Sequence, residues 1–240
     1  MYDWNVFGSS IATATSSGAV VKATPDGQGY NVTANTSGGW DLNAKQLIDD
    51  GDTPLSIFIV WSQNTYDNLT AGGDVLYAER PNGTQIFKLI INDNRRLSVV
   101  MRDGSGGGLI LNPTGASVDQ TKELHTGAFV QRSGTNRDFY CDGSTANITN
   151  SNTGAFSTAA TPAVGYDPND LSVGANESTI LAVFTWRRAL SALEIRALEA
   201  NPWQLLQPRT QLIPVGVAAA PSGFQAAWAR NSNQIIGISQ

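Results

Sequence analysis

Short runs of β-forming residues, separated by turn signals, recur along most of this chain of 240 residues. The strongest run is 55–61, Leu-Ser-Ile-Phe-Ile-Val-Trp, whose apolar middle predicts a strand buried on both faces. In 85–91 large apolar residues recur at alternate positions, as expected of a strand with one face toward a core. Asp142-Gly143 favours a tight hairpin, because both residues tolerate positive φ. The pattern predicts an all-β fold of about a dozen strands in one main domain.

One short helix is expected at about 191–200. The segment 191–194, Ser-Ala-Leu-Glu, is a capping box, in which the Ser hydroxyl accepts from the Glu amide and the Glu carboxylate accepts from the Ser amide. Leu193 and Leu198 belong to its expected apolar face. Pro202 then ends the helix, since the residue before a proline disfavours helical geometry.

Charge and composition exclude several partners. The formal net charge is -5 and no Lys/Arg cluster is present, so we expect no nucleic acid partner. No apolar run approaches the roughly 18 residues of a membrane span, so we expect no membrane partner. His125 is the only histidine of the sequence and Cys141 its only cysteine, which excludes a conventional zinc site and an internal disulfide. The first residues contain no export signal, so no signal peptide is expected.

The pattern of carboxylates argues against catalysis. A glycosidase needs two carboxylates about 5–5.5 Å or about 6.5–9.5 Å apart across the scissile bond, commonly at alternate positions of one strand. Glu79 and Glu177 stand alone in the sequence, and Glu194 is explained by helix capping. His125 has no nucleophile motif near it. We therefore expect no enzymatic activity and no catalytic residues.

Two acidic loops have the oxygen-rich chemistry of a calcium site, although loop solvation and turn formation explain them as well. Neither matches the twelve-residue calcium-loop pattern, so no cofactor is assigned and calcium is left open. The candidate ligands are Asp49, Asp50, Asp52, Asp167 and Asp170.

Four segments resemble one known family in their order and spacing. The segment 123–130, Glu-Leu-His-Thr-Gly-Ala-Phe-Val, resembles a strand of laminin-G-like, concanavalin-type lectin domains. The segments 139–143 and 172–175 resemble that family's Asp-Gly hairpin and a following strand, and 182–195 resembles its closing strand and helix. The resemblance implies a two-sheet antiparallel jelly-roll sandwich with glycan binding as its common role.

A second resemblance lies downstream. The segment 200–208, Ala-Asn-Pro-Trp-Gln-Leu-Leu-Gln-Pro, is similar to one that follows such domains in tailed-phage and prophage structural proteins. This resemblance implies a virion component, either a capsid decoration protein or a part of the tail or fibre. Such a protein would assemble in the host bacterial cytoplasm, leave by lysis, contact other virion proteins and copies of itself, and display its body to host-surface glycans. A free-standing carbohydrate-binding module is the alternative, and a glycoside hydrolase is the second alternative.

The chain is expected to divide into a jelly-roll domain, 1–206, and an assembly segment, 207–240. From Ala200 onward the only charged residues are Arg209 and Arg230, and a low-charge segment of this kind would anchor the protein, in a homotrimer or larger ring. The expected assembly contacts are Phe224, Trp228, Ile235 and Ile236. Rim aromatics could stack on sugars, and the candidates are Trp40, Tyr66, Tyr77, Tyr166 and Trp203. Trp61 and Trp186 lie in apolar strands and are assigned to the core.

Overall fold

The computed structural model describes a set of segments that all fall within 1–206. They are 14–17, 20–24, 27–31, 39–42, 54–63, 73–79, 85–102, 108–111, 113–149, 162–165, 167 and 178–205. The expected strand at 172–175 and the expected assembly contacts Phe224, Trp228, Ile235 and Ile236 lie outside these residues, so the division at 206 stays a prediction.

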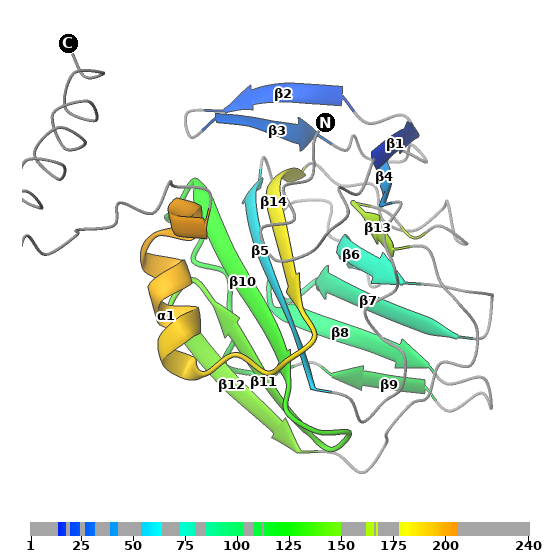
Figure 1. Cartoon of the computed structure of the whole chain (residues 1–240), viewed down its shortest axis with the longest axis vertical. Helices are drawn as coiled ribbons and strands as arrows, with labels where there is room; N and C mark the ends of the chain where they lie inside the picture. Colours follow the sequence, from blue (N-terminus) through cyan, green and yellow to red (C-terminus); the bar gives the residue numbers. More distant parts are fainter. Residues whose placement is uncertain are drawn as a thin grey trace, which may run out of the picture. The chain divides into compact units, whose positions relative to one another are not determined.

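The described strands form two antiparallel sheets (Figure 1). The first sheet has the order β1-β4-β13-β6-β7-β8-β9. Its strands are β1 (Ala14–Ser17), β4 (Gly39–Leu42), β13 (Pro162–Val164), β6 (Asp74–Glu79), β7 (Ile86–Ile91), β8 (Leu97–Arg102) and β9 (Gly108–Leu111). The second sheet has the order β12-β11-β10-β5-β14-β3-β2. Its strands are β12 (Ser144–Thr149), β11 (Asn136–Cys141), β10 (Leu124–Gln131), β5 (Leu55–Gln63), β14 (Ser178–Trp186), β3 (Gly27–Asn31) and β2 (Val20–Thr24).

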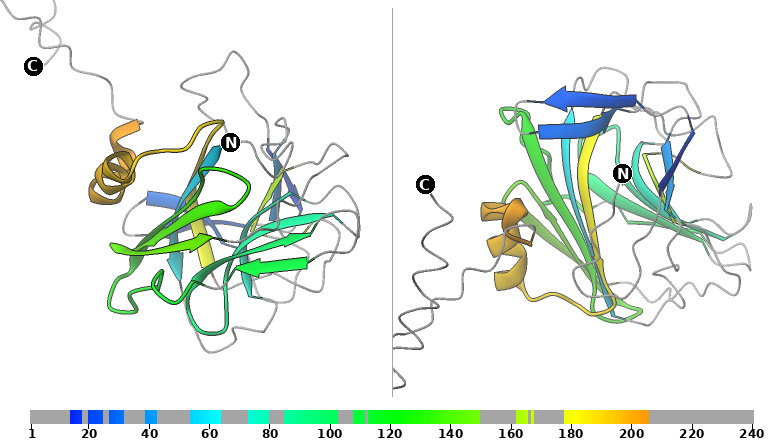
Figure 2. Two further views of the ribbon diagram at one scale, coloured as in Figure 1. Left: turned by 90° about the horizontal axis from the view of Figure 1, so that it is seen from below. Right: turned by 45° about the horizontal axis from the view of Figure 1, so that its top comes forward.

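β5 is buried on both faces, as its apolar sequence predicts. Ile57 and Ile59 point between the sheets and pack in one cluster with Phe87 of the first sheet. Phe58 and Val60 point to the opposite face and pack in a second cluster beneath the helix. The fold is therefore the predicted all-β, two-sheet sandwich, with a helix over the outer face of the second sheet (Figure 2).

The helix α1 (Ala192–Ala200) begins at the predicted capping box. The Ser191 hydroxyl accepts from the Glu194 amide at 3.3 Å, and the Glu194 carboxylate accepts from the Ser191 amide at 2.8 Å. Hydrogen bonds from Arg188, followed by the bond from the Ser191 amide, lower the pKa of Glu194 from 4.5 to about 2. A short turn, η1 (Pro202–Leu205), follows the helix. No helix among the described residues is long and apolar enough to cross a membrane.

The buried face of α1 differs from the expected one. Ile195 and Leu198 are buried against the second sheet, whereas Leu193 is 82% exposed. The prediction for Leu193 was wrong because residues two positions apart point to nearly opposite sides of a helix, so burial of Ile195 turns Leu193 to solvent. Leu190, just before the helix, packs in the cluster with Ile195 and Leu198 instead.

The Asp-Gly turn between β11 and β12 joins elements that are distant in sequence. Asp142 and Gly143 have positive φ, 49° and 90°, as the hairpin prediction requires. The Asp142 carboxylate accepts from the amides of Asp119 at 2.9 Å and Thr126 at 3.0 Å, and it bonds His125 Nδ1 at 2.8 Å. His125 is thus a buried residue held by Asp142, which ties the start of β10 to the turn.

The same turn also holds the helix. Arg196 of α1 donates to the Gly143 carbonyl at 2.8 Å, and Glu199 accepts from the Gly143 amide at 3.2 Å. The Arg196 guanidinium lies 5.8 Å from the centre of the Tyr140 ring. The strand with His125, the Asp-Gly hairpin and the closing helix, which carry the family resemblance in sequence, therefore meet at one point.

Candidate functional site

The two buried carboxylates of β6 do not form a glycosidase pair. Glu79 is 1% exposed and accepts from the Tyr77 hydroxyl at 2.6 Å. Asp74 is 5% exposed and accepts from Gln63 at 2.8 Å. Both carboxylates belong to β6, and their five-residue separation corresponds to about 16 Å of extended strand, which is too far for the shared work of two catalytic carboxylates.

The sequence candidates for calcium fall in two groups. Asp167 is fully buried and lies 2.9 Å from Lys88 Nζ, so an ammonium group occupies a position that a bound cation would need. Among the residues with described side chains, no group of three His, Cys, Asp or Glu residues could hold a metal ion. The remaining candidates, Asp49, Asp50, Asp52 and Asp170, lie outside the described residues.

The aromatic candidates are divided between the core and the surface. Tyr77 is 1% exposed in the cluster between the sheets, so its assignment to the rim was wrong. Trp61 is fully buried in the same cluster, as predicted. Trp203 of η1 is half-buried against the cluster beneath the helix. Tyr66, Tyr166 and the side chain of Trp40 lie outside the described part of the chain.

Trp186 is half-buried on the outer face of the second sheet, where it packs against the cluster beneath the helix, so its assignment to the core holds only in part. Its ring stacks on that of Phe184, with centroids 6.2 Å apart and planes at 30°. Phe184 in turn lies against the fully buried ring of Phe58 on β5, with centroids 6.4 Å apart. We call Phe184 and Trp186 the β14 aromatic pair. The two rings form a partly exposed apolar surface resting on the core.

The backbone around the β14 aromatic pair is fixed by a buried serine. Ser56 of β5 lies opposite Trp186 in the sheet register. Its hydroxyl donates to the Arg188 carbonyl and accepts from the Leu190 amide, both at 2.9 Å. The segment that leaves β14 is therefore held against β5, and the two rings are kept in place before any ligand arrives.

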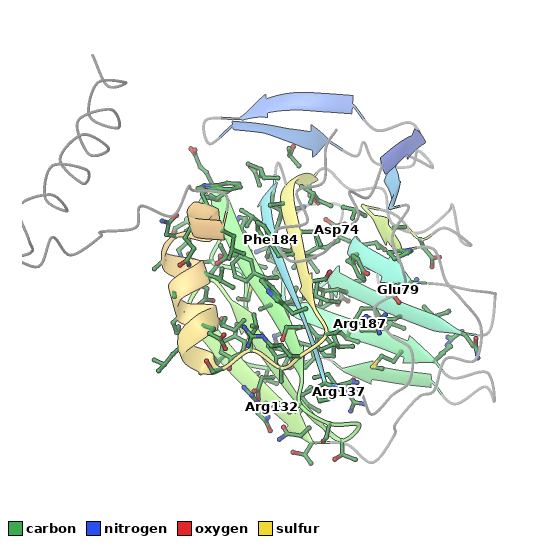
Figure 3. All side chains as sticks on the ribbon, viewed as in Figure 1. Asp74, Glu79, Arg132, Arg137, Phe184 and Arg187 are labelled. Atoms are coloured by element: carbon green, nitrogen blue, oxygen red, sulfur yellow. The ribbon has the colours of Figure 1, made fainter. Side chains whose placement is uncertain are left out.

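Polar side chains leave the opposite face of the same strand. Thr185 and Arg187 are both exposed. Figure 3 shows Arg187 and Phe184 on opposite sides of β14, with Arg187 on the side of Glu79. Burial, and then the Glu79 charge, raise the pKa of Tyr77 well above its ordinary value, while the positive charge of Arg187 acts in the opposite direction. The guanidinium therefore lies within electrostatic reach of the Tyr77 and Glu79 pair.

A second arginine lies deeper at this end of the sandwich. Arg137 of β11 is fully buried, and its Nε donates to Gln131 of β10 at 3.3 Å.

The end of β14 combines a stacked aromatic surface with the exposed Thr185 hydroxyl and the exposed Arg187 guanidinium. Aromatic faces pack on apolar ligand faces, and the polar groups can bond hydroxyl or carboxylate groups, which is the usual composition of a small-molecule binding surface.

The chain resembles known proteins in its structure and not in its sequence. No family model matches the chain, and no curated protein matches its sequence. The sialidase carbohydrate-binding domain CBM40 of Ruminococcus gnavus matches with a TM-score of 0.56 and 11% identity, covering 78% of this chain and 98% of that one. The same domain has also been solved bound to α2,3 sialyllactose.

Two other structures match over a similar part of this chain. Domain 4 of AbnA, an extracellular arabinanase of Geobacillus stearothermophilus solved with arabinotriose, has a TM-score of 0.57 and 13% identity, covering 81% of this chain and 91% of that one. A Trypanosoma rangeli sialidase has a TM-score of 0.54 and 16% identity, covering 81% of this chain but 30% of the enzyme. These likenesses show that the chain has the β-sandwich jelly-roll fold found in carbohydrate-binding domains.

Proposed function

We propose that this chain is a carbohydrate-binding module whose ligand stacks on the β14 aromatic pair. The observation that carries the proposal is the stacked, half-buried arrangement of Phe184 and Trp186. A ring pair held by Phe58 beneath and by the Ser56 bonds beside it loses little conformational freedom on binding, which favours affinity for a weakly interacting ligand.

The exposed arginine after the ring pair suggests which sugars would bind best. Arg187 follows Trp186 directly and projects from the other face of the strand. A guanidinium can bind a carboxylate through two parallel hydrogen bonds, which are stronger than bonds to neutral hydroxyls. We therefore expect an acidic oligosaccharide that reaches around the end of β14, such as sialyllactose, to bind better than neutral arabinotriose.

Titration calorimetry with α2,3 sialyllactose, α2,6 sialyllactose and arabinotriose tests this proposal. Removing one ring with Trp186→Ala is expected to weaken binding about tenfold, because an aromatic contact contributes about 0.5–1.5 kcal/mol beyond its buried area. Trp203→Ala is the matched control, since Trp203 is a half-buried tryptophan against the same cluster but outside the ring pair. Equal losses in both variants, or no binding of any sugar by the unaltered protein, would contradict the proposal.

A virion role is a second proposal, and the observation favouring it is the segment 200–208. In the structure Asn201 closes α1, with its amide bonded to the Ala197 carbonyl at 3.1 Å, and Pro202–Leu205 forms η1. The resemblance of this segment to phage structural proteins, together with the low-charge sequence of 207–240, supports assembly with other virion proteins and release by host lysis.

The role of the terminal segment in assembly can be measured directly. Deletion of 221–240 is expected to leave a folded protein that no longer forms a trimer or larger ring in light scattering. An unchanged oligomer after the deletion would contradict the anchoring role, while leaving the glycan proposal untouched.

A further inference from the structure

One edge of β14 has no strand beside it in the described part of the chain. β5 pairs with β14 from Ser178 to Trp186. On the other side, β3 pairs only with Thr179 and Ile180. No described strand therefore pairs with 182–186 on that side, and Figure 1 shows β14 continuing well past β3.

This edge lacks the features that normally prevent edge strands from pairing. Exposed edges in soluble proteins usually carry lysine, proline or a bulge. The segment 182–186 reads Ala-Val-Phe-Thr-Trp, with no charge and no proline. The irregularity in β14 falls earlier, between Ile180 and Ala182. Thr185 is exposed and the other four residues are half-buried, so solvent reaches the segment in part. An uncharged, partly exposed edge of this kind is suited to pairing with another strand.

We propose that two copies of this chain pair through 182–186, antiparallel across a two-fold axis at Phe184. Centring the axis there pairs the whole unpartnered segment with itself. Phe184 then faces its own copy, and Ala182 faces Trp186. Opposed side chains in such a pair are about 4.5–5.5 Å apart at Cβ, so aromatic rings at 184 would touch and a small residue would accept the large indole.

The arrangement agrees with the charges of the strand. Arg187 falls outside the five paired residues, so no like charges are opposed. The contact is the same on both copies, which gives a closed dimer rather than an open chain of molecules. Because pairing uses the backbone edge and the rings lie on the outer face, the dimer would place the two β14 aromatic pairs in one row. The dimer does not depend on the glycan proposal.

A charge-swap experiment tests the pairing, because residue 184 meets itself only in this register. Light scattering of the full chain should show a dimer, or a larger even number of copies where the terminal segment also assembles the chain. Phe184→Lys and Phe184→Glu should each halve that number, since like charges oppose across the axis, and an equimolar mixture should restore it. Leu193→Lys, on the exposed face of α1, is the control and should keep the full number of copies. An odd number of copies in the unaltered chain, single variants of unchanged mass or a mixture that stays at half the mass would each overturn the proposal.

A second measurement covers the case in which charge at 184 prevents folding, which circular dichroism would reveal. Phe184→Cys should form a disulfide-linked dimer under mild oxidation, whereas Leu193→Cys should not. The native Cys141 does not interfere, because it is fully buried and burial raises the pKa of its thiol well above the ordinary value. Equal cross-linking at both positions would refute the register.

Discussion

Replacement of Asp142 by Asn should destabilise the fold more than its position in a surface turn suggests. Asn also tolerates the positive φ of 49° at this position, so the change tests the carboxylate and not the backbone. The side chain is 1% exposed and receives the amides of Asp119 and Thr126 and bonds the His125 ring. An amide has one acceptor oxygen, so at least one of these groups loses its acceptor.

The expected cost follows from that lost acceptor. A buried donor without a partner costs about 1–3 kcal/mol, and bonds to a charged group are at the upper end. We therefore expect Asp142→Asn to lower the free energy of unfolding by about 2 kcal/mol, measured by urea unfolding with circular dichroism. Asp93→Asn is the matched control, because Asp93 is an exposed turn residue bonded to the neighbouring Asn94 side chain. A change below about 0.5 kcal/mol in Asp142→Asn, the usual size for surface substitutions, would refute the reasoning.

Three further changes have defined outcomes. The depressed pKa of Glu194 gives stability that is present above the ordinary value of 4.5 and lost as the pH falls toward 2. Thermal unfolding of Glu194→Gln and the unaltered chain should therefore converge over that range. Gly127→Ala should cost about 1–3 kcal/mol in urea unfolding, because its Cβ would lie 3.0 Å from the Trp61 ring and force the packing to shift. Calcium addition or chelation should leave the thermal midpoint unchanged, since Lys88 already neutralises Asp167. A calcium-dependent rise would place an ion on the acidic loops.

Features set by local chemistry or by a run of apolar residues could be predicted from the sequence. The apolar middle of 55–61 predicts a strand buried on both faces, and β5 is buried on both faces. The capping box at Ser191 depends on residues three positions apart, and its two bonds form as expected. Asp142-Gly143 selects its turn through backbone sterics alone. In each case the interacting groups are close in sequence.

The proposed glycan surface was harder to predict because it depends on what packs over each strand. In β6 the register shifts between Val75 and Tyr77, so Leu76 and Tyr77 both point into the core and simple alternation fails. Trp186 looked like a core residue in an apolar strand, but it lies on a face that the helix covers only in part. Its position next to two arginines was the one local signal of exposure.

The most direct test of the proposed glycan surface is nuclear magnetic resonance of the tryptophan indole groups during titration with sialyllactose. The chain has six tryptophans, and Trp186→Phe would assign the signal of interest. Trp61 is a built-in reference, because its indole N–H is buried in the core. We predict a saturable shift of the Trp186 signal with no change at Trp61. Titration that moves no indole signal, or moves that of Trp203 alone, would contradict binding at the β14 aromatic pair.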